Sequence, residues 1–381
     1  MSNKKHQVCT RCVMDTSDSK IEFNSDGVCN HCQEFDGITS IDWHPDNKGK
    51  EILRDILKDV RSQGKNQEYD CIIGLSGGID SSYLALLLKE YDLKPLVVHV
   101  DAGWNSELAV YNVEKIIKYC GFDLYTHVMD WEEMRDLHVS YLKSGISNQD
   151  TIQDHAFFAS LYHFAVKNKI KYVISGGNIA TESVSPKSWH HSAMDASNIR
   201  HIHKKFSGKS LKNYKTISFF EYYFYYPMVL GMKTIRPLNF MPYNSREALQ
   251  VLKETVGYKE YGRKHGESRF TKFFQNYYLP RKFGIDKRII HLSSMILSEQ
   301  ITRDEALEEL RKPLYNPVEL LEDKSYIAKK LLISIDELDG YIDGPGSSYS
   351  NYRNWDNKYN VMKKLQKIIT KITGKKIKNY S

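Results

Sequence analysis

Strand and helix patterns alternate along residues 69–178. A mostly apolar run at 69–76 predicts a buried strand, and the segments at 94–106, 123–130 and 170–178 predict further strands. The segments between them predict helices at 81–91, 107–121, 131–142 and 154–169. Runs without polar alternation are typical of strands that are buried on both faces of a parallel sheet. We therefore predict an α/β fold with a doubly wound parallel sheet, whose ligands bind outside the carboxyl ends of the strands.

The alternation fades after residue 180. Residues 180–206 are polar, aromatic and rich in histidine, which favours a substrate-facing loop and helix. These histidines lack the helical spacing and the carboxylates of a second metal site. One more strand, within 232–241, is expected to bring Lys233 and Arg236 to the same edge of the sheet.

The rest of the chain is mostly helical. A helix at 244–257 has Asn244 as its N-cap and Gly257 at its end, and residues 325–342 predict two short helices joined near Ser334. The predicted division has three parts: a cysteine module at 1–40, the α/β domain at 41–245, and a helical region for substrate or partner at 246–381.

The turn between the first strand and its helix reads Ser76-Gly77-Gly78-Ile79-Asp80-Ser81. A strand, a Gly-Gly turn and a helix N-terminus bring free backbone N–H groups and the positive end of a helix dipole to one point, which favours an anion. The spacing fits neither the G-x-x-x-x-G-K-[ST] loop nor the G-x-G-x-x-G fingerprint.

This hexapeptide resembles the pyrophosphate loop of the PP-loop ATP pyrophosphatases, which have the adenine nucleotide alpha hydrolase-like fold. The resemblance implies that ATP is cleaved to AMP and pyrophosphate while a substrate oxygen is adenylated. It also implies that Asp80 orients Mg²⁺ or the loop, and that backbone groups at the end of the second strand contact adenine. The expected ATP-binding residues are Ser76, Gly77, Gly78, Asp80, Ser81, Ser82, His99, Val100, Gly176 and Gly177.

Four of the six cysteines form one pattern near the start of the chain. Cys9-x-x-Cys12 and Cys29-x-x-Cys32 are separated by sixteen residues, a spacing that lets four thiolates surround a structural Zn²⁺. Two disulfides are the alternative, which the absence of an export signal disfavours. An iron–sulfur cluster is a second alternative.

Residues 261–296, together with 9–19, 175–183 and 300–315, resemble the N-acetyl sugar amidotransferases of the WbpG and PseA type. The resemblance implies an enzyme of lipopolysaccharide O-antigen or nonulosonic acid biosynthesis. Such an enzyme converts an acetamido group of a free or nucleotide-linked N-acetyl sugar to an acetamidino group. ATP activates the amide oxygen, ammonia attacks the adenylated intermediate, and AMP and pyrophosphate are released.

This chemistry requires cations near the phosphates and a carboxylate that accepts a proton from ammonia. Glu182 and Glu267 are the expected proton acceptors. The expected catalytic residues are Asp80, Glu182, Lys233, Arg236, Glu267 and Arg269, with Lys264 as a further cation. For each of these charged residues, an ordinary structural ion pair is the competing interpretation.

The formal net charge of +7 suits a polyanionic small molecule and also permits nucleic acid. Much of it is local, because eight lysines and no acidic residue follow from Lys358 onward, with Met362, Leu365, Ile369 and Ile372 at helical spacing. This pattern favours an amphipathic helix docked on the core, with a membrane surface or nucleic acid as alternative contacts. Without a leader or a spanning segment, we expect a cytoplasmic protein.

Ammonia is expected from a separate glutaminase chain, because Ser2 stands where an N-terminal cysteine nucleophile would follow Met1. The aromatic segment at 217–230 is a candidate docking surface for that chain. Two other functions stay open. One is a PP-loop enzyme that modifies tRNA, of the lysidine synthase or thiolase kind; the other is a zinc-containing adaptor that no longer uses nucleotide, which the intact hexapeptide disfavours.

Overall fold

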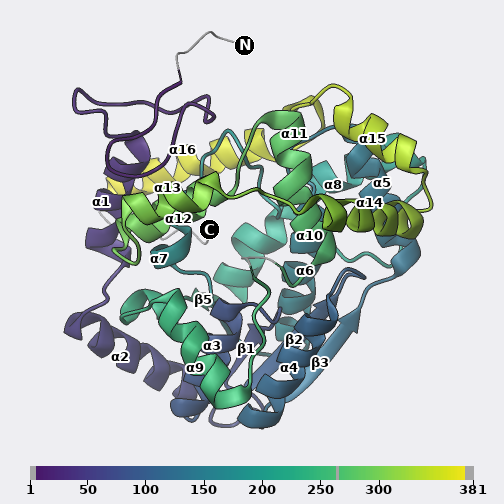
Figure 1. Cartoon of the computed structure of the whole chain (residues 1–381). Coiled ribbons are helices and arrows are strands. Elements are labelled where there is room, and N and C mark those ends of the chain that lie inside the picture. Colours follow the sequence, from purple (N-terminus) through teal and green to yellow (C-terminus); the bar gives the residue numbers. More distant parts are fainter. Residues whose placement is uncertain (1–5, 263–265, 374–381) are drawn as a thin grey trace.

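The computed structural model describes residues 6–262 and 266–373. Its lower half in Figure 1 contains a five-stranded sheet in the order β3-β2-β1-β4-β5, and every neighbouring pair is parallel. The parallel sheet predicted from the apolar runs is therefore confirmed. The strands are β1 (Cys71–Gly74), β2 (Pro95–Asp101), β3 (Asp123–Val128), β4 (Tyr172–Ile174) and β5 (Lys233–Ile235).

Helices cover both faces of this sheet, and successive side chains of β1, β2 and β4 alternate between two separate cores, whereas the edge strand β3 is mostly exposed. Ile73 and Val97 pack into one core, whereas Ile72, Val98 and Val173 pack into the other. The first core is completed by α2 (Asn47–Gly64), α3 (Ile79–Glu90), α4 (Glu107–Cys120) and α9 (Ser245–Val256). The second is completed by α5 (Trp131–Ser144), α6 (Thr151–Lys167) and α8 (Ala196–Ser207). The doubly wound arrangement is thus confirmed.

The strand order places β1 between β2 and β4. After β1 the chain moves outward through β2 to β3, and then returns to the other side of β1 to form β4 and β5. The connections reverse direction at this point, so the carboxyl ends of β1 and β4 flank the crevice where open α/β sheets bind ligands. Helix α6, which precedes β4, crosses this region: an ideal Cβ on Gly74, the last residue of β1, would lie only 2.1 Å from Phe157 Cζ.

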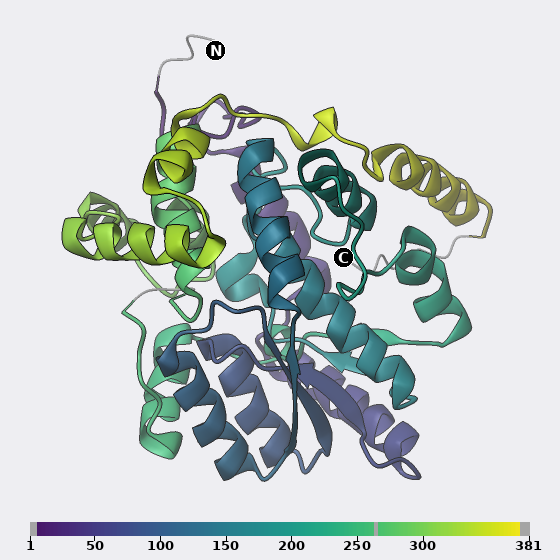
Figure 2. The ribbon, with the colours of Figure 1, turned by 90° about the vertical axis from the view of Figure 1, so that its right-hand side faces the viewer.

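A helical layer stands above the sheet in Figures 1 and 2 and has its own core. The cysteine knuckles and α1 (Asn30–Asp42) lie in this layer beside helices from the C-terminal third. The other α-helices are α7 (Ile179–Glu182), α10 (Arg269–Phe273), α11 (Leu279–Phe283), α12 (Arg288–Leu297), α13 (Arg303–Arg311), α14 (Pro317–Leu331) and α15 (Ile335–Asp343). The two ends of the sequence therefore share one hydrophobic core.

Short irregular helices complete the chain. They are the π-helices η1 (Glu221–Val229) and η3 (Phe274–Tyr278) and the 3₁₀ helices η2 (Pro237–Phe240) and η4 (Tyr349–Asn351). The aromatic segment that contains η1 is only partly covered, since Tyr226 is buried whereas Phe220, Met228 and Val229 are exposed.

The predicted helix ends at Asn244, Gly257 and Ser334 are confirmed: Asn244 and Ser334 cap α9 and α15 with their side chains, and Gly257 ends α9 in the left-handed conformation. The last helix, α16 (Asp356–Thr373), buries Met362 but leaves Leu365 54% exposed, so the predicted docking stripe holds only in part. The side chains of Ile369 and Ile372 lie outside the described part. No helix among the described residues is long and apolar enough to cross a membrane.

Candidate functional site

The turn after β1 leaves the amides at the start of α3 open. Gly78, which has no side chain, occupies the N-cap position, and the described residues show no side-chain cap bond there. The Ser76 hydroxyl accepts a hydrogen bond from the Gly78 amide at 3.2 Å and lies 3.3 Å from the Ser81 hydroxyl. Backbone N–H groups of a first helical turn have no partner within the helix, so an anion can bind them.

Gly77 has to be glycine in this turn. Its φ of +90° is costly for a residue with a side chain, and an ideal Cβ would lie 3.0 Å from both the Ala109 carbonyl oxygen and the Tyr261 hydroxyl. The turn is therefore held in a conformation, and at a distance from its neighbours, that only glycine permits.

A second Ser-Gly-Gly turn, Ser175-Gly176-Gly177, follows β4. The Gly177 amide donates to the Ser175 hydroxyl at 3.2 Å, which repeats the bond between Gly78 and Ser76. An ideal Cβ on Gly176 would lie 3.0 Å from the carbonyl carbon of Asp80 and 3.1 Å from the Ser81 nitrogen. The two turns thus meet at the crevice between β1 and β4.

Three charged side chains gather around the two turns. An ideal Cβ on Gly177 would lie 3.6 Å from Glu182 Oε2 and 3.9 Å from Arg236 Nε, and one on Gly78 would lie 3.3 Å from Glu267 Oε1. Glu182 ends α7 and Arg236 follows β5. The structure therefore brings Glu182, Arg236 and Glu267 together with Asp80 and the glycines.

The predicted placement of Lys233 is wrong. Lys233 is the first residue of β5 and pairs in register with Tyr172, the first residue of β4, so it lies at the amino edge of the sheet. Its ammonium group is 3.4 Å from a carboxylate oxygen of Asp59 in α2 and 3.2 Å from the Tyr172 hydroxyl. Because β5 spans only three residues, Arg236 reaches the carboxyl edge and Lys233 does not. Lys264 lies outside the described residues.

Arg269 is held in a buried ion-pair network. Its Nε donates to Asp323, which is 1% exposed, and Lys272 lies 2.6 Å from the other oxygen of the same carboxylate. Burial alone raises the pKa of Asp323, but hydrogen bonds from Lys272, Tyr315 and Arg269 outweigh burial and lower it. Since this network joins α10 to α14, we interpret Arg269 as structural and assign it no catalytic step.

His99 in β2 holds the backbone just before the first turn, at Leu75. Its Nδ1 lies 2.7 Å from the Leu75 carbonyl oxygen, which can only accept, so Nδ1 donates there. Its Nε2 then accepts from the Asn105 amide at 3.0 Å. Val100 is buried one residue further along, and Ser82 is buried in α3, where no described residue bonds to its hydroxyl. The His99 side chain therefore supports the backbone at the turn, whereas Ser82 forms no such bond.

Three tyrosines that sequence reasoning missed also hold the first turn. The Tyr243 hydroxyl donates to Asp80 Oδ1, and the hydroxyls of Tyr258 and Tyr261 donate to the Gly77 carbonyl oxygen at 2.8 and 3.0 Å. Burial raises the pKa of Tyr261 to about 12 and that of Tyr243 further, which keeps both hydroxyls as donors. Tyr258 and Tyr261 lie three residues apart in the sequence, but no motif marks Tyr243.

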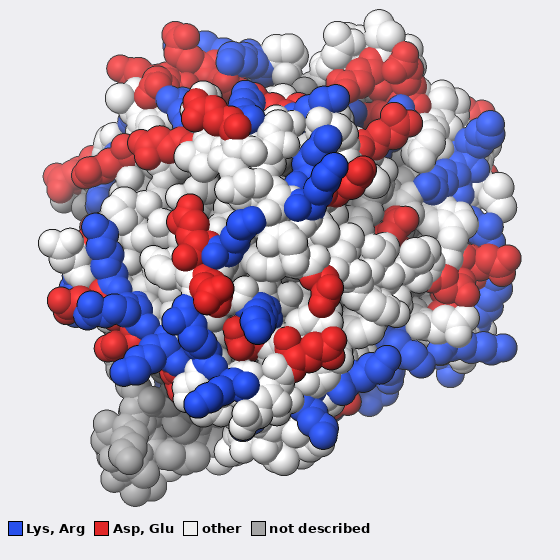
Figure 3. Space-filling model, turned by 90° about the horizontal axis from the view of Figure 1, so that it is seen from below, with Lys and Arg blue, Asp and Glu red and all other residues white. Residues whose placement is uncertain are grey.

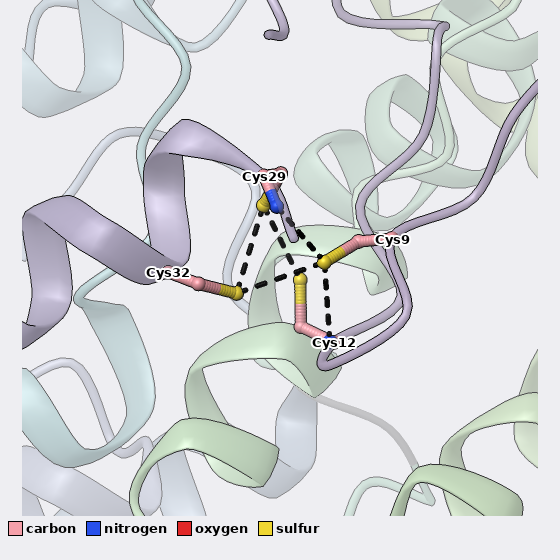
Figure 4. A group of neighbouring side chains, drawn as sticks. All are labelled: Cys9, Cys12, Cys29 and Cys32. Atoms are coloured by element: carbon pink, nitrogen blue, oxygen red, sulfur yellow. Dashed lines mark hydrogen bonds between the residues drawn. The ribbon is translucent and has the colours of Figure 1, made fainter. Parts of the chain in front are cut away.

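The four cysteines of the knuckles form a second candidate site, in which their side chains point toward one another (Figure 4). The measured Sγ–Sγ distances are 3.8 Å for Cys9 and Cys32, 3.7 Å for Cys12 and Cys29, and 3.6 Å for Cys29 and Cys32. A tetrahedron with metal–sulfur bonds of about 2.3 Å has edges of about 3.8 Å. All four are fully buried and none forms a disulfide, so the donor set fits one metal ion. Among the described residues, this is the only cluster of metal-ligand type found.

Backbone and C-terminal contacts hold the knuckles in place. The Cys29 amide donates to Cys9 Sγ at 3.2 Å. Arg303, the first residue of α13, donates to the carbonyl oxygens of Cys12 at 3.0 Å and Cys9 at 2.9 Å. The Val13 amide donates to the Ser293 hydroxyl of α12 at 3.3 Å. The metal centre is therefore built onto the helical layer of the C-terminal third.

Residues 267–366 match a family model described as the C-terminal domain of WbpG-like LPS biosynthesis proteins. No curated protein matches the chain significantly. Among solved structures, the chain is similar to NMN synthetase from Francisella tularensis, with a TM-score of 0.33, 15% identity, and coverage of 80% of this chain and 89% of that one. It is also similar to NH3-dependent NAD synthetase from Campylobacter jejuni, with a TM-score of 0.31, 13% identity, and coverage of 74% and 94%. Because these scores and identities are low, the function proposed below rests on the site geometry and on the match of the C-terminal region.

Proposed function

We propose that this chain is an ATP-dependent PP-loop enzyme that adenylates a substrate oxygen. The observation that carries the proposal is the meeting of two Ser-Gly-Gly turns at the start of α3, where Gly77 has a positive φ and an ideal Cβ on Gly176 would lie 3.0 Å from the backbone of Asp80. The Ser76 and Ser81 hydroxyls and the amides from Gly77 to Ser81 bind the β- and γ-phosphates of ATP. Mg²⁺ bound with ATP would neutralise phosphate charge, and Asp80 is the residue placed to orient it or the turn.

The acceptor proposed is the acetamido group of a free or nucleotide-linked N-acetyl sugar, in lipopolysaccharide O-antigen or nonulosonic acid biosynthesis. The match of residues 267–366 to a WbpG-like LPS biosynthesis domain supports this substrate class. An amide oxygen is a poor leaving group. Its attack on the α-phosphorus of ATP releases pyrophosphate and leaves the amide carbon bonded to AMP, which departs readily.

Ammonia then replaces AMP at that carbon. Ammonium has to lose one proton to become a nucleophile and a second as the carbon–nitrogen bond forms, because the new nitrogen of the amidinium product carries two hydrogens. Glu182 and Glu267, beside the turns, are the carboxylates that take the first proton. Arg236 stabilises the negative charge that develops on the departing phosphates.

A separate glutaminase subunit is the proposed source of ammonia. The exposed side chains of Phe220, Met228 and Val229 on the aromatic segment 217–230 are a candidate docking surface. We propose Zn²⁺ as the structural metal of the four cysteines and a cytoplasmic location for the chain. Seen from below in Figure 3, Lys and Arg are interspersed with Asp and Glu on this face, an arrangement that does not favour nucleic acid.

The first experiment is mass spectrometry of a panel of UDP-linked N-acetyl sugars incubated with the protein, Mg·ATP and an ammonium salt. The expected product has one oxygen replaced by NH, and it forms together with AMP and pyrophosphate. The Asp80→Ala variant is expected to form none of these. If no sugar changes while added tRNA triggers pyrophosphate release, the adenylating site stands and the acceptor is RNA.

A milder change tests the support of the turn. Tyr243→Phe removes the hydrogen bond to Asp80 and is expected to lower kcat/KM for ATP by at least about 10-fold, since a hydrogen bond to a charged group contributes about 1.5–3 kcal/mol. Tyr83→Phe is the matched control, because the centroid of its ring lies 5.7 Å from that of Tyr243 and, within the part of the chain that the structure describes, its hydroxyl forms no hydrogen bond to the turn. Equal steady-state kinetics for the two variants would show that the bond to Asp80 does not matter.

A further inference from the structure

The first turns of α6 stand directly above the phosphate-binding turn. Phe157 of α6 covers Gly74 at the end of β1. Asp150 immediately precedes the helix, seven residues before Phe157, and therefore lies about 10 Å further along its axis, beyond the carboxyl edge of the sheet. Residues at i, i+3 or i+4, and i+7 share one face of a helix, so Asp150, Gln153 and Phe157 lie on the same side.

A chain of contacts joins Asp150 to the phosphate-binding turn. Glu267 reaches Gly78, and the next residue, Ser268, has its hydroxyl 3.5 Å from Gln153 Oε1. Gln153 Nε2 donates to Asp150 Oδ1 at 2.8 Å, and the Thr271 hydroxyl donates to the same oxygen at 3.1 Å. Ser268 and Thr271 belong to the segment that matches the WbpG-like model. We call Asp150, Gln153, Ser268 and Thr271 the acceptor side of the site.

Among the described residues, the Asp150 carboxylate accepts side-chain hydrogen bonds through only one of its two oxygens. It occupies the N-cap position of α6, yet its side chain caps no helix amide. It is 6% exposed, and within residues 6–262 and 266–373 both hydrogen bonds to it end on Oδ1, so none reaches Oδ2. A carboxylate oxygen without such a bond can accept a proton from a bound molecule.

Burial, followed by the charge of Asp154 one turn later in α6, raises the pKa of Asp150 to about 8. Thr271, Lys287 and Gln153 act in the opposite direction. Lys287 precedes α12 and lies 3.1 Å from His190 Nε2. A carboxylate with a pKa near the working pH is a far better proton acceptor than one with its ordinary value.

We propose that Asp150 takes up the second proton, the one that leaves the attacking nitrogen as the carbon–nitrogen bond of the amidine forms. This assignment rests on the proposed function. In the step, ammonia bonds to the amide carbon, the carbon–oxygen bond breaks with its electron pair going to AMP, and the proton passes to Asp150 Oδ2. Glu182 and Glu267 lie beside the two glycine turns, whereas Asp150 lies about 10 Å beyond Phe157 along the axis of α6.

The test separates the two half-reactions in Asp150→Asn, which keeps the Oδ1 acceptor but cannot take up the proton. Exchange of labelled pyrophosphate into ATP, measured with UDP-linked N-acetyl sugars and no ammonia, is expected to stay within about 3-fold of the wild type. Formation of amidine at a fixed concentration of free ammonia is expected to fall by about 10²–10⁴-fold. If Asp150→Asn lost both pyrophosphate exchange and amidine formation, the proposal would be overturned, because Asp150 would then bind the acceptor or support the fold. Unchanged amidine formation would also overturn it.

The pH dependence supplies a second readout. At fixed free ammonia, the wild-type rate of amidine formation is expected to rise with pH and level off above the pKa of Asp150. Asp154→Asn is expected to move this rise to lower pH by removing a like charge, and Asp150→Asn is expected to abolish it. If the rise persists in Asp150→Asn, another group takes the proton.

Thermal unfolding tests whether Asp150→Asn still folds. The folded state holds a proton on Asp150 that the unfolded state releases near pH 4, so this group makes the wild type less stable as pH rises from about 4 to about 8. Asp150→Asn is therefore expected to gain Tm relative to the wild type over that range. If the wild type itself shows no exchange with any sugar, the proposed function fails, and the role of Asp150 fails with it.

Discussion

Gly77→Ala is expected to lower kcat/KM for ATP by at least about 100-fold, equivalent to about 2.7 kcal/mol of transition-state stabilisation. The alanine would have to adopt the positive φ of Gly77, +90°, which residues with a side chain rarely do. Its Cβ would lie 3.0 Å from the Ala109 carbonyl oxygen and the Tyr261 hydroxyl. The turn can escape these contacts only by moving its amides away from the position in which they bind phosphate. Steady-state kinetics with varied ATP measures the effect.

Gly121→Ala is the matched control for this variant. Gly121 ends α4 with φ +70°, so alanine there has a comparable backbone cost of about 1–2 kcal/mol. Apart from its two chain neighbours, no described residue has an atom within 4 Å of its ideal Cβ, so alanine displaces none of them. The control is expected to lose stability but keep its activity. If the two variants showed equal activity, the glycine in the turn would have no role in binding ATP.

Removal of the metal is expected to destabilise the C-terminal helices as well as the knuckles. Cys29→Ser should cost at least about 5 kcal/mol of folding free energy, because binding of a structural zinc ion contributes about 10–16 kcal/mol in small cysteine sites. The loss should spread because Arg303 of α13 and Ser293 of α12 bond directly to the backbone of the knuckles. Thermal unfolding and hydrogen exchange at the amides of α12 and α13 measure it.

Cys120→Ser is the control for the metal experiment. Cys120 is also a buried free cysteine, but it lies in α4, and its thiol donates to the Ala85 carbonyl oxygen, a bond that serine can replace. It is expected to retain one bound metal per chain and a Tm near that of the wild type. A Cys29→Ser protein with the same Tm and metal content as this control would contradict a structural metal at the four cysteines.

Features with a local cause could be predicted from the residues alone. The first phosphate-binding turn is one continuous segment of strand, glycines and helix, and the helix caps are adjacent residues. The cysteine spacing likewise places two knuckles on a short piece of chain, so their chemistry could be predicted from the residues alone. The alternation of apolar runs with helices was sufficient for a doubly wound parallel sheet, because strands buried on both faces carry that pattern.

Contacts between side chains that are distant in the sequence depend on how the fold packs. Lys233 and Arg236 are three residues apart, yet the short length and register of β5 place them at opposite edges of the sheet. Tyr243, just before α9, donates a hydrogen bond to Asp80, and Arg269 forms an ion pair with Asp323. The cysteine knuckles are hydrogen-bonded to α12 and α13. Tertiary packing likewise buries Asp150 and places it beside Thr271 of α10. These contacts depend on how whole faces of helices and sheet pack together, and neither local propensity nor spacing along the chain encodes that pairing.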